Sequence, residues 1–341
     1  MSNFTLGLVI LGGLVLAALV AWQTWTSRRN APRQPELPAA PIDPVLDDET
    51  RAEPVFDSQP APLPPPERKP GLDALIDVIA AIALDGPTSG EAALAAMPTT
   101  RRVGSKPFAI EGENELTQHW ETPQAGQRYG AFQAGVQLAN RTGALNDIEY
   151  SEFVMKVQAF ADAVGGAVEI PEMRHEVARA RELDAFAGDH DAQLSFTLRA
   201  RNTAWSPGYV QQSASRLGFV AGAIPGRLVL PASQPGLPPV LGLSFDTQSA
   251  MADDPALSAI RDVTLSVDVP QVPRGEQPFV RMRDCAQELA SAMDGWISDD
   301  NGKPIPPESL DVIGADLEIL YDTLDARDLA AGSPQARRLF S

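Results

Sequence analysis

The chain has 341 residues and a formal net charge of −18 at pH 7. This acidic excess argues against a nucleic-acid partner and against binding to an anionic membrane surface, because both carry negative charge. Cys285 is the only cysteine, which excludes an intramolecular disulfide and agrees with a reducing compartment.

The N-terminal residues carry a membrane signal. No charged side chain occurs before Arg28, and the apolar run approaches the roughly 20 residues that cross a bilayer core. Trp22 and Trp25 lie where indole rings favour the interface, and Arg28 and Arg29 follow at once. By the positive-inside rule, this pattern predicts a single-pass transmembrane helix over residues 4–25, with the N-terminus outside and the rest in the cytoplasm. A cleaved signal peptide would need preceding positive charges and a small-residue cleavage site, and neither is present.

Residues 26–70 differ in composition from the rest of the chain. Prolines recur at every third residue and then cluster, with acidic residues between them: Pro32, Pro35, Pro38, Pro41, Pro44, Pro62, Pro64, Pro65 and Pro66. Proline removes backbone donors and the stretch has little apolar surface to bury, so we expect it not to pack. Forty such residues would span about 35 Å as a flexible coil or up to ~120 Å as polyproline II. The segment is interpreted as a semi-stiff tether or as an indifferent spacer.

From residue 71 onward, the pattern of strands and helices occurs twice. Apolar residues recur at spacings of 3, 4, 3 and 4 in both halves, at Tyr150, Phe153, Val157, Phe160 and Val164 and again at Phe279, Met282, Ala286, Leu289 and Met293. Such a stripe predicts one buried helix face. Each stripe is followed by a glycine turn, a short strand and a closing helix. We therefore expect two tandem α+β domains, over residues 71–188 and 189–332.

Strands are predicted upstream of each of these helices. Apolar and polar residues alternate over 131–138, 193–198, 241–246 and 263–268. This period of two is typical of a half-buried strand with its apolar side against helices and its polar side outward.

No group of residues indicates catalysis or metal binding. Gly104-Ser105-Lys106 lacks the upstream glycine of a phosphate loop, and Glu172 and His175 stand without further ligands. Cys285 lies at the edge of an apolar helix stripe, where a packing role is the common one. We expect no enzyme, no cofactor, no metal and no small-molecule substrate.

Several local strings resemble one protein family. Residues 262–270 resemble its last long strand running into Val-Pro, and residues 279–300 resemble its long helix, glycine turn and strand ending in paired aspartates. Residues 217–219 fall where the family has a Gly-Phe after its first helix, and residues 161–166 resemble its helix end in the first half. On these strings, residues 189–332 resemble the C-terminal FtsZ-binding domain of the bacterial cell-division protein family ZipA, and residues 71–188 resemble a divergent copy.

The resemblance implies a fold and a function. Each domain would be a split β-α-β unit with an antiparallel sheet and helices on one face. The chain would be a non-catalytic adaptor that binds the C-terminal tail of FtsZ and tethers division-ring filaments to the cytoplasmic face of the inner membrane. The alternative is a membrane-tethered scaffold of the same fold with another protein partner.

The resemblance also implies a docking site on the outer sheet face of the second domain. Its expected positions are Gln193, Ser195, Ile224, Gly226, Ser244, Asp246, Thr264 and Ser266. Only Ile224 among them is large and apolar, whereas the docking face of the family is rich in apolar side chains. The sequence leaves open which domain binds, whether the domains pack on each other, and the oligomeric state.

Overall fold

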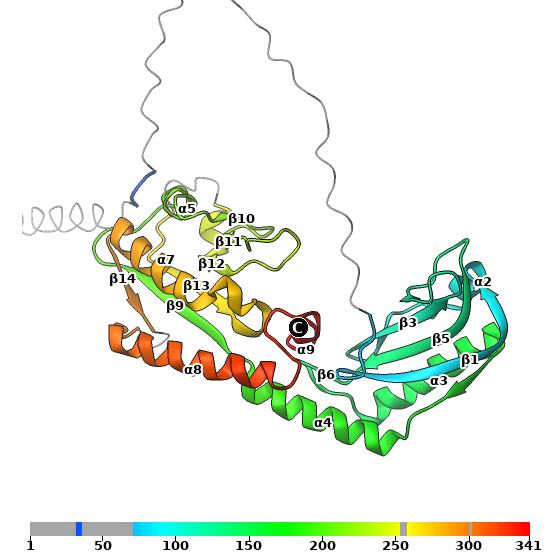
Figure 1. Cartoon of the computed structure of the whole chain (residues 1–341). Coiled ribbons are helices and arrows are strands. Elements are labelled where there is room, and N and C mark those ends of the chain that lie inside the picture. Colours follow the sequence, from blue (N-terminus) through cyan, green and yellow to red (C-terminus); the bar gives the residue numbers. More distant parts are fainter. Residues whose placement is uncertain (1–31, 36–70, 253–257, 300–301) are drawn as a thin grey trace, which may run out of the picture. The chain divides into compact units, whose positions relative to one another are not determined.

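The computed structural model describes residues 32–35, 71–252, 258–299 and 302–341. The predicted membrane helix at 4–25 and most of the predicted tether lie outside these residues. Among the described residues, no helix combines the length and apolar character needed to cross a membrane. The described part divides into two compact units (Figure 1). The first unit contains residues 71–192, 269–275 and 316–341, and the second contains 32–35, 193–268 and 276–315.

The first unit is built on an antiparallel sheet with the strand order β2-β3-β5-β1-β8, and β4 also pairs with β3. The strands are β1 (Asp77–Ser89), β2 (Arg102–Val103), β3 (Lys106–Asn114), β4 (Trp120–Glu121), β5 (Arg128–Gln137) and β8 (Gly166–Glu169). A separate short ladder pairs β6 (Ala139–Asn140) with β7 (Gly143–Ala144). The helices are α2 (Gly90–Ala96), α3 (Asp147–Val164), α4 (Met173–His190) and α9 (Pro334–Leu339), with a 3-10 turn, η2, at Val269–Gln271.

The second unit contains a six-stranded antiparallel sheet with the order β10-β11-β12-β13-β9-β14. The strands are β9 (Gln193–Ala200), β10 (Val220–Ala221), β11 (Arg227–Leu230), β12 (Leu241–Ser244), β13 (Asp262–Asp268) and β14 (Gly295–Ser298). The helices are α5 (Pro207–Ser215), α6 (Thr247–Ala250) and α7 (Pro278–Met293). The 3-10 turn η3 (Arg274–Glu276) and helix α8 (Pro307–Asp325) each have residues in both units.

The two predicted helix stripes form the cores of these units. All five residues of the second-half stripe are buried, and α7 packs on β9, β13 and β14. Its Phe279 ring meets Phe196 edge to face, with ring centroids 6.4 Å apart. In the first unit, Phe160 of α3 meets Phe132 of β5 in the same way at 5.2 Å. The spacing of 3 and 4 therefore identified the core-facing sides of both helices correctly.

The turns that end the two helices differ from one another. Gly165 ends α3 in the left-handed conformation, with φ of 70°, as glycine allows without a steric cost. In α7 the left-handed residue is Asp294, with φ of 52°, and Gly295 is already part of β14. A Cβ on Gly295 would lie 3.2 Å from the Trp205 ring, so this glycine is needed for close packing rather than for the turn.

Both units share one order of elements. The first strand of each unit lies between the strand that precedes the long helix and the strand that follows it. In the first unit β1 lies between β5 and β8, and α3 connects those two strands. In the second unit β9 lies between β13 and β14, and α7 connects them. Both units are thus α+β, with antiparallel sheets and the same order of elements around the first strand.

Candidate functional site

The sheet of the second unit has an apolar face and a polar face. Leu198, Leu243 and Leu265 are buried on the apolar face, which α7 covers. The alternate residues point the other way, because successive side chains of a strand leave opposite faces of the sheet. We call the half-buried set Ser195, Thr197, Ser244, Thr264 and Ser266 the polar face.

Strand register brings these small hydroxyl side chains together. Ser266 of β13 lies opposite Ser195 of β9 on one side and Gly242 of β12 on the other. In the next row, Thr264 lies between Thr197 and Ser244. The centre of the polar face therefore consists of short side chains, which leave the sheet backbone close to the surface.

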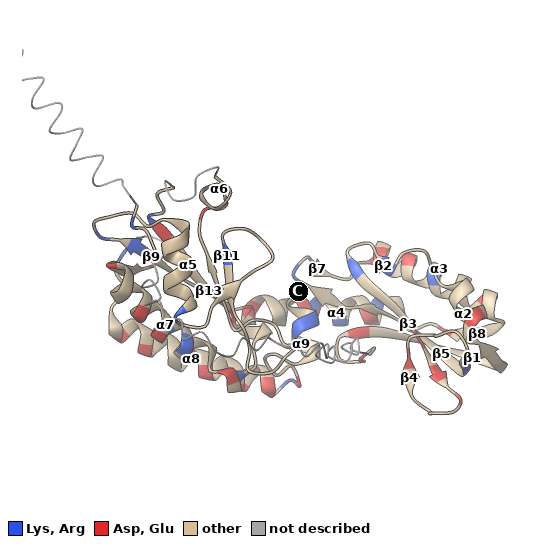
Figure 2. Ribbon diagram, turned by 90° about the horizontal axis from the view of Figure 1, so that it is seen from above, with Lys and Arg blue, Asp and Glu red and all other residues tan. Residues whose placement is uncertain are grey.

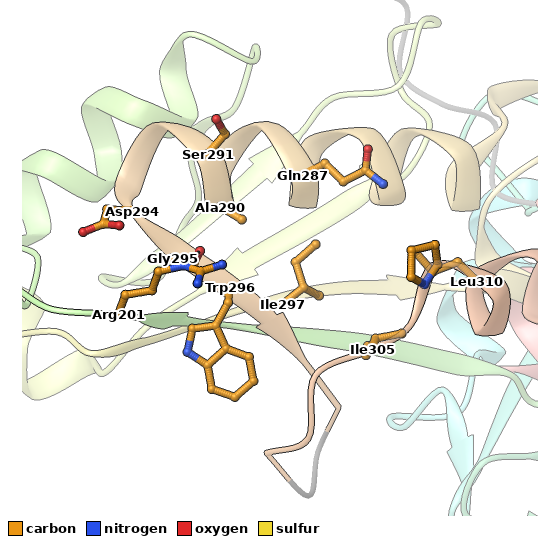
Figure 3. Close-up of a pocket in the computed structure, with 11 residues that line it drawn as sticks. Arg201, Gln287, Ala290, Ser291, Asp294, Gly295, Trp296, Ile297, Ile305 and Leu310 are labelled. Atoms are coloured by element: carbon orange, nitrogen blue, oxygen red, sulfur yellow. Dashed lines mark hydrogen bonds between the residues drawn. The ribbon is translucent and has the colours of Figure 1, made fainter.

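Larger side chains lie toward both ends of the polar face. At one end, Val220 of β10 pairs with Val229 of β11, and Val220 is 49% exposed. At the other end, Trp296 of β14 pairs with Arg199 of β9. Figure 3 shows that Trp296 and Ile297 point to opposite sides of β14, with Ile297 on the side of α7.

Four of the eight predicted site residues are members of the polar face, namely Ser195, Ser244, Thr264 and Ser266. Gln193 extends the same face at the start of β9, where it pairs with Asp268. Ile224 and Gly226 lie in the turn between β10 and β11, with Ile224 50% exposed and Gly226 buried at φ of 79°.

The structure places Asp246 outside the sheet, and the strand predicted over 241–246 ends at Ser244. The Asp246 carboxylate instead accepts hydrogen bonds from the backbone N–H groups of Gln248 and Ser249 and from the Ser249 hydroxyl, which cap α6. These bonds lower the pKa of Asp246, with the Ser249 hydroxyl contributing most. Such local capping competes with strand pairing, which explains the early end of β12.

Sequence reasoning did not include Thr197, Val229 and Trp296 among the site positions. Thr197 continues the period of two from Ser195, so that alternation was a usable signal for it. Val229 and Trp296 are on short strands of four residues, where periodicity is too brief to assign a face.

A cavity of about 430 Å³ lies on the opposite side of β14, between α7 and the start of α8 (Figure 3). Ala290, Ile297, Ile305 and Leu310 are among its apolar residues. Arg201 crosses its edge, where its Nε donates a hydrogen bond to the Gly295 carbonyl at 3.0 Å. Acidic side chains follow one another along α8, which has no basic residue in its sequence (Figure 2). Arg201 and Asp294 are the charged side chains among its lining residues.

Metal chemistry has no visible basis in the described part of the chain. Its residues contain no group of three or more His, Cys, Asp or Glu side chains that could hold an ion. Burial raises the pKa of the Cys285 thiol on α7, which disfavours the reactive thiolate.

Comparison with protein families gives one match, to the C-terminal FtsZ-binding domain of ZipA, over residues 251–315. This segment contains β13, at the centre of the polar face, together with α7, β14 and the first turns of α8. No curated protein matches the chain. The matched family is non-catalytic, in agreement with the prediction that the chain is not an enzyme. The resemblance predicted from the strings at 262–270 and 279–300 is thus confirmed, in that residues 251–315 match the ZipA C-terminal FtsZ-binding domain family.

Proposed function

We propose that this protein is a membrane-anchored, non-catalytic cell-division adaptor whose second unit binds the C-terminal tail of FtsZ. The family match over residues 251–315 carries this proposal. In this role residues 4–25 anchor the chain in the inner membrane, and both folded units lie in the cytoplasm. The apolar run and the arginines at 28 and 29 support that topology.

The polar face is the first candidate for the docking site. It lies on the side of the sheet opposite to α7, and the matched segment supplies its central strand. Short side chains at its centre would let a tail peptide approach the sheet, while Val220, Ile224 and Trp296 offer apolar contacts at its ends. A peptide that buries a few hundred Å² of apolar surface gains only ~25 cal/mol per Å². Micromolar-scale affinity is therefore the expected strength.

The corresponding face of the first unit is a second candidate. Its strands β1, β3 and β5 place Ala81, Ala83, Ala109 and Ala131 on the side opposite to α3, and the first three are exposed. We call these four residues the alanine face. The same side of the sheet also carries Glu113 opposite Ala131, and Gln133 and Glu169 on the two sides of Ala81, so small apolar positions alternate there with polar and acidic ones. The first unit would then be a divergent second copy of the domain that has taken over docking.

A different partner remains the alternative to FtsZ. The hydroxyl-rich character of the polar face favours it, since the docking face expected of the family is apolar. In that case the fold would be kept and the ligand would differ.

The test is a titration of the full chain, reconstituted in nanodiscs, with a labelled FtsZ C-terminal peptide read by fluorescence anisotropy. Saturable binding at micromolar concentrations is expected. Thr264→Asp should weaken it at least tenfold if the polar face is the site, and Ala83→Asp should do so if the alanine face is the site, because each places a desolvated charge under the peptide.

Thr117→Asp is the matched control, since it adds the same charge at an exposed hairpin residue away from both faces. Thermal unfolding of each variant excludes loss of folding as the cause. Absence of binding by the wild type at several hundred micromolar would contradict the FtsZ proposal and leave the alternative partner.

A further inference from the structure

A short piece of the proline-rich segment packs on the second unit, contrary to the expectation that residues 26–70 do not pack. Arg33 pairs in parallel with Trp205. The Arg33 N–H donates to the Ala204 carbonyl at 2.7 Å, and the Ser206 N–H donates to the Arg33 carbonyl at 3.0 Å. Figure 1 shows this piece, in blue, beside α5.

Arg33 pairs with a residue that is buried and hydrogen-bonded within the second unit. Trp205 is fully buried, and its Nε1 donates to the Met293 carbonyl at 2.7 Å. The backbone of Trp205 also exchanges two hydrogen bonds of 2.8 Å with Ile260 on its other side. Arg33 therefore extends a short ladder that is already fixed in the core, which is the geometry of strand addition.

Side chains add selectivity to this backbone pairing. Arg33 Nη2 lies 3.3 Å from Asp294 Oδ2, at the left-handed end of α7. Pro35 lies against Gly208, where a Cβ would be 3.4 Å from the proline Cγ. The surface thus accepts an extended segment that carries an arginine followed two residues later by a proline.

We propose that residues 32–35 are a releasable strap that sets the distance between the membrane and the second unit. This proposal rests on the anchor of the proposed function. With the strap docked, only eight peptide units separate residue 25 from Arg33, and they span at most ~28 Å. With the strap released, the path from the anchor to the second unit runs through all of residues 26–70, about 35 Å as a flexible coil, and through the first unit.

The contacts suit a reversible strap rather than a permanent one. Arg33 and Asp294 are each more than a third exposed, so solvent and salt screen their attraction. The Arg33 backbone adds two hydrogen bonds, and Pro35 adds a contact with Gly208. Raised ionic strength is therefore expected to favour release.

Disulfide trapping of the full chain in nanodiscs tests the docking. In a Cys285→Ser background, Pro35→Cys with Gly208→Cys should form an intramolecular disulfide rapidly under a mild oxidant. Pro35→Cys with Ser215→Cys is the matched control, because Ser215 is exposed at the other end of α5, ~10 Å away. Equal rates for the two pairs, or links only between differently tagged chains, would overturn the intramolecular strap.

Energy transfer tests the effect on reach. A donor on Ser215→Cys and an acceptor lipid report the distance of the second unit from the membrane. Arg33→Glu should lower the transfer efficiency at least twofold, whereas Arg29→Glu, with the same charge change outside the pairing residue, should not. Trapping without any such change would overturn the control of distance while the docking stands. Neither readout uses FtsZ, so failure of the peptide titration leaves this test unaffected.

Discussion

Tyr150 and Tyr321, two buried residues of the first unit, differ in the hydrogen bonding of their hydroxyl groups. The Tyr150 hydroxyl donates to the Pro171 carbonyl. The Tyr321 hydroxyl is buried and has no hydrogen-bond partner in the described part of the chain, although Arg274 lies 5.6 Å from the centre of its ring. Burial raises the pKa of both hydroxyls to about 12, and neighbouring glutamates add to the effect.

We predict opposite effects for two identical substitutions. Tyr321→Phe should raise the free energy of unfolding by ~1 kcal/mol, because it removes a buried polar group that no bond compensates. Tyr150→Phe should lower it by ~1 kcal/mol, because it leaves the Pro171 carbonyl without its donor. Denaturant unfolding at pH 7 measures both, and each variant serves as the control for the other. A loss of stability in Tyr321→Phe would contradict this account.

The same tyrosines predict a weakness at alkaline pH. Their pKa in the folded state is about 12, above the ~10 of an unfolded chain, so the unfolded state releases protons first. Stability should therefore fall as the pH rises from about 10 to 12. The fall should be smaller in both Phe variants, and unfolding midpoints between pH 8 and pH 12 will show this. A parallel fall in wild type and variants would sink the assignment to these residues.

Local patterns predicted the residue positions on helices better than the ends of strands. The predicted apolar stripes of α3 and α7 were correct because a buried helix face requires an apolar residue at each of about four successive turns. Asp246 was misplaced because one capping carboxylate changes a strand end without altering the alternation before it. The pairing of Arg33 with Trp205 had no local signal at all, since the two residues are far apart in the chain.

At the scale of elements, α9 shows the same limit most clearly. It follows residue 332, beyond both predicted domains, yet Leu339 and Phe340 are buried in the first unit. Arg338 binds the Asp77 carboxylate of β1 through two hydrogen bonds, one of 2.9 Å and one of 2.5 Å, between residues 261 positions apart. Neither the sequence of β1 nor that of α9 contains a pattern that predicts their contact.

We predict that this ion pair fastens α9 to the sheet. The side chain of Asp77 is fully buried, and that of Arg338 is 20% exposed. Arg338→Met should cost about 3 kcal/mol of unfolding free energy, because it leaves a buried carboxylate unpaired. Arg337→Met removes the same charge from the same helix, and we expect a much smaller loss. Denaturant unfolding of the two variants gives the comparison, and equal losses would contradict the role of the pair.

The pH dependence of that loss follows from Asp77. Burial raises the pKa of this carboxyl, and the Arg338 hydrogen bonds counteract part of the rise. Removal of Arg338 should raise the pKa further. A buried carboxyl whose pKa is raised by folding does not destabilise the folded state while it is protonated. The free energy of unfolding falls as the pH rises through the folded-state pKa. The deficit of Arg338→Met should therefore be smaller at pH 4 than at pH 7, and a deficit that grows on acidification would be inconsistent with this origin.

At the scale of the whole molecule, the two units are not two consecutive stretches of chain. The first unit is completed by residues 269–275 and 316–341, which follow the main part of the second unit. Each unit still repeats the same order of elements around its first strand. The α+β pattern of strands and helices was predictable from the sequence because it is local, whereas the return of the chain to the first unit depends on contacts of long sequence separation.

This threading predicts that residues 71–192 do not form an independent domain. The fragment lacks Arg338, Leu339 and Phe340, and loss of large buried side chains costs about 2–5 kcal/mol each. Such a loss is a large share of the 5–15 kcal/mol that stabilises an ordinary domain. The fragment should melt without a cooperative transition, and fusion of residues 316–341 through a flexible linker should restore one. Circular dichroism melts of the two forms provide the comparison. If residues 71–192 alone unfold cooperatively at the temperature of the fused form, the returning segments are not needed for the first unit to fold.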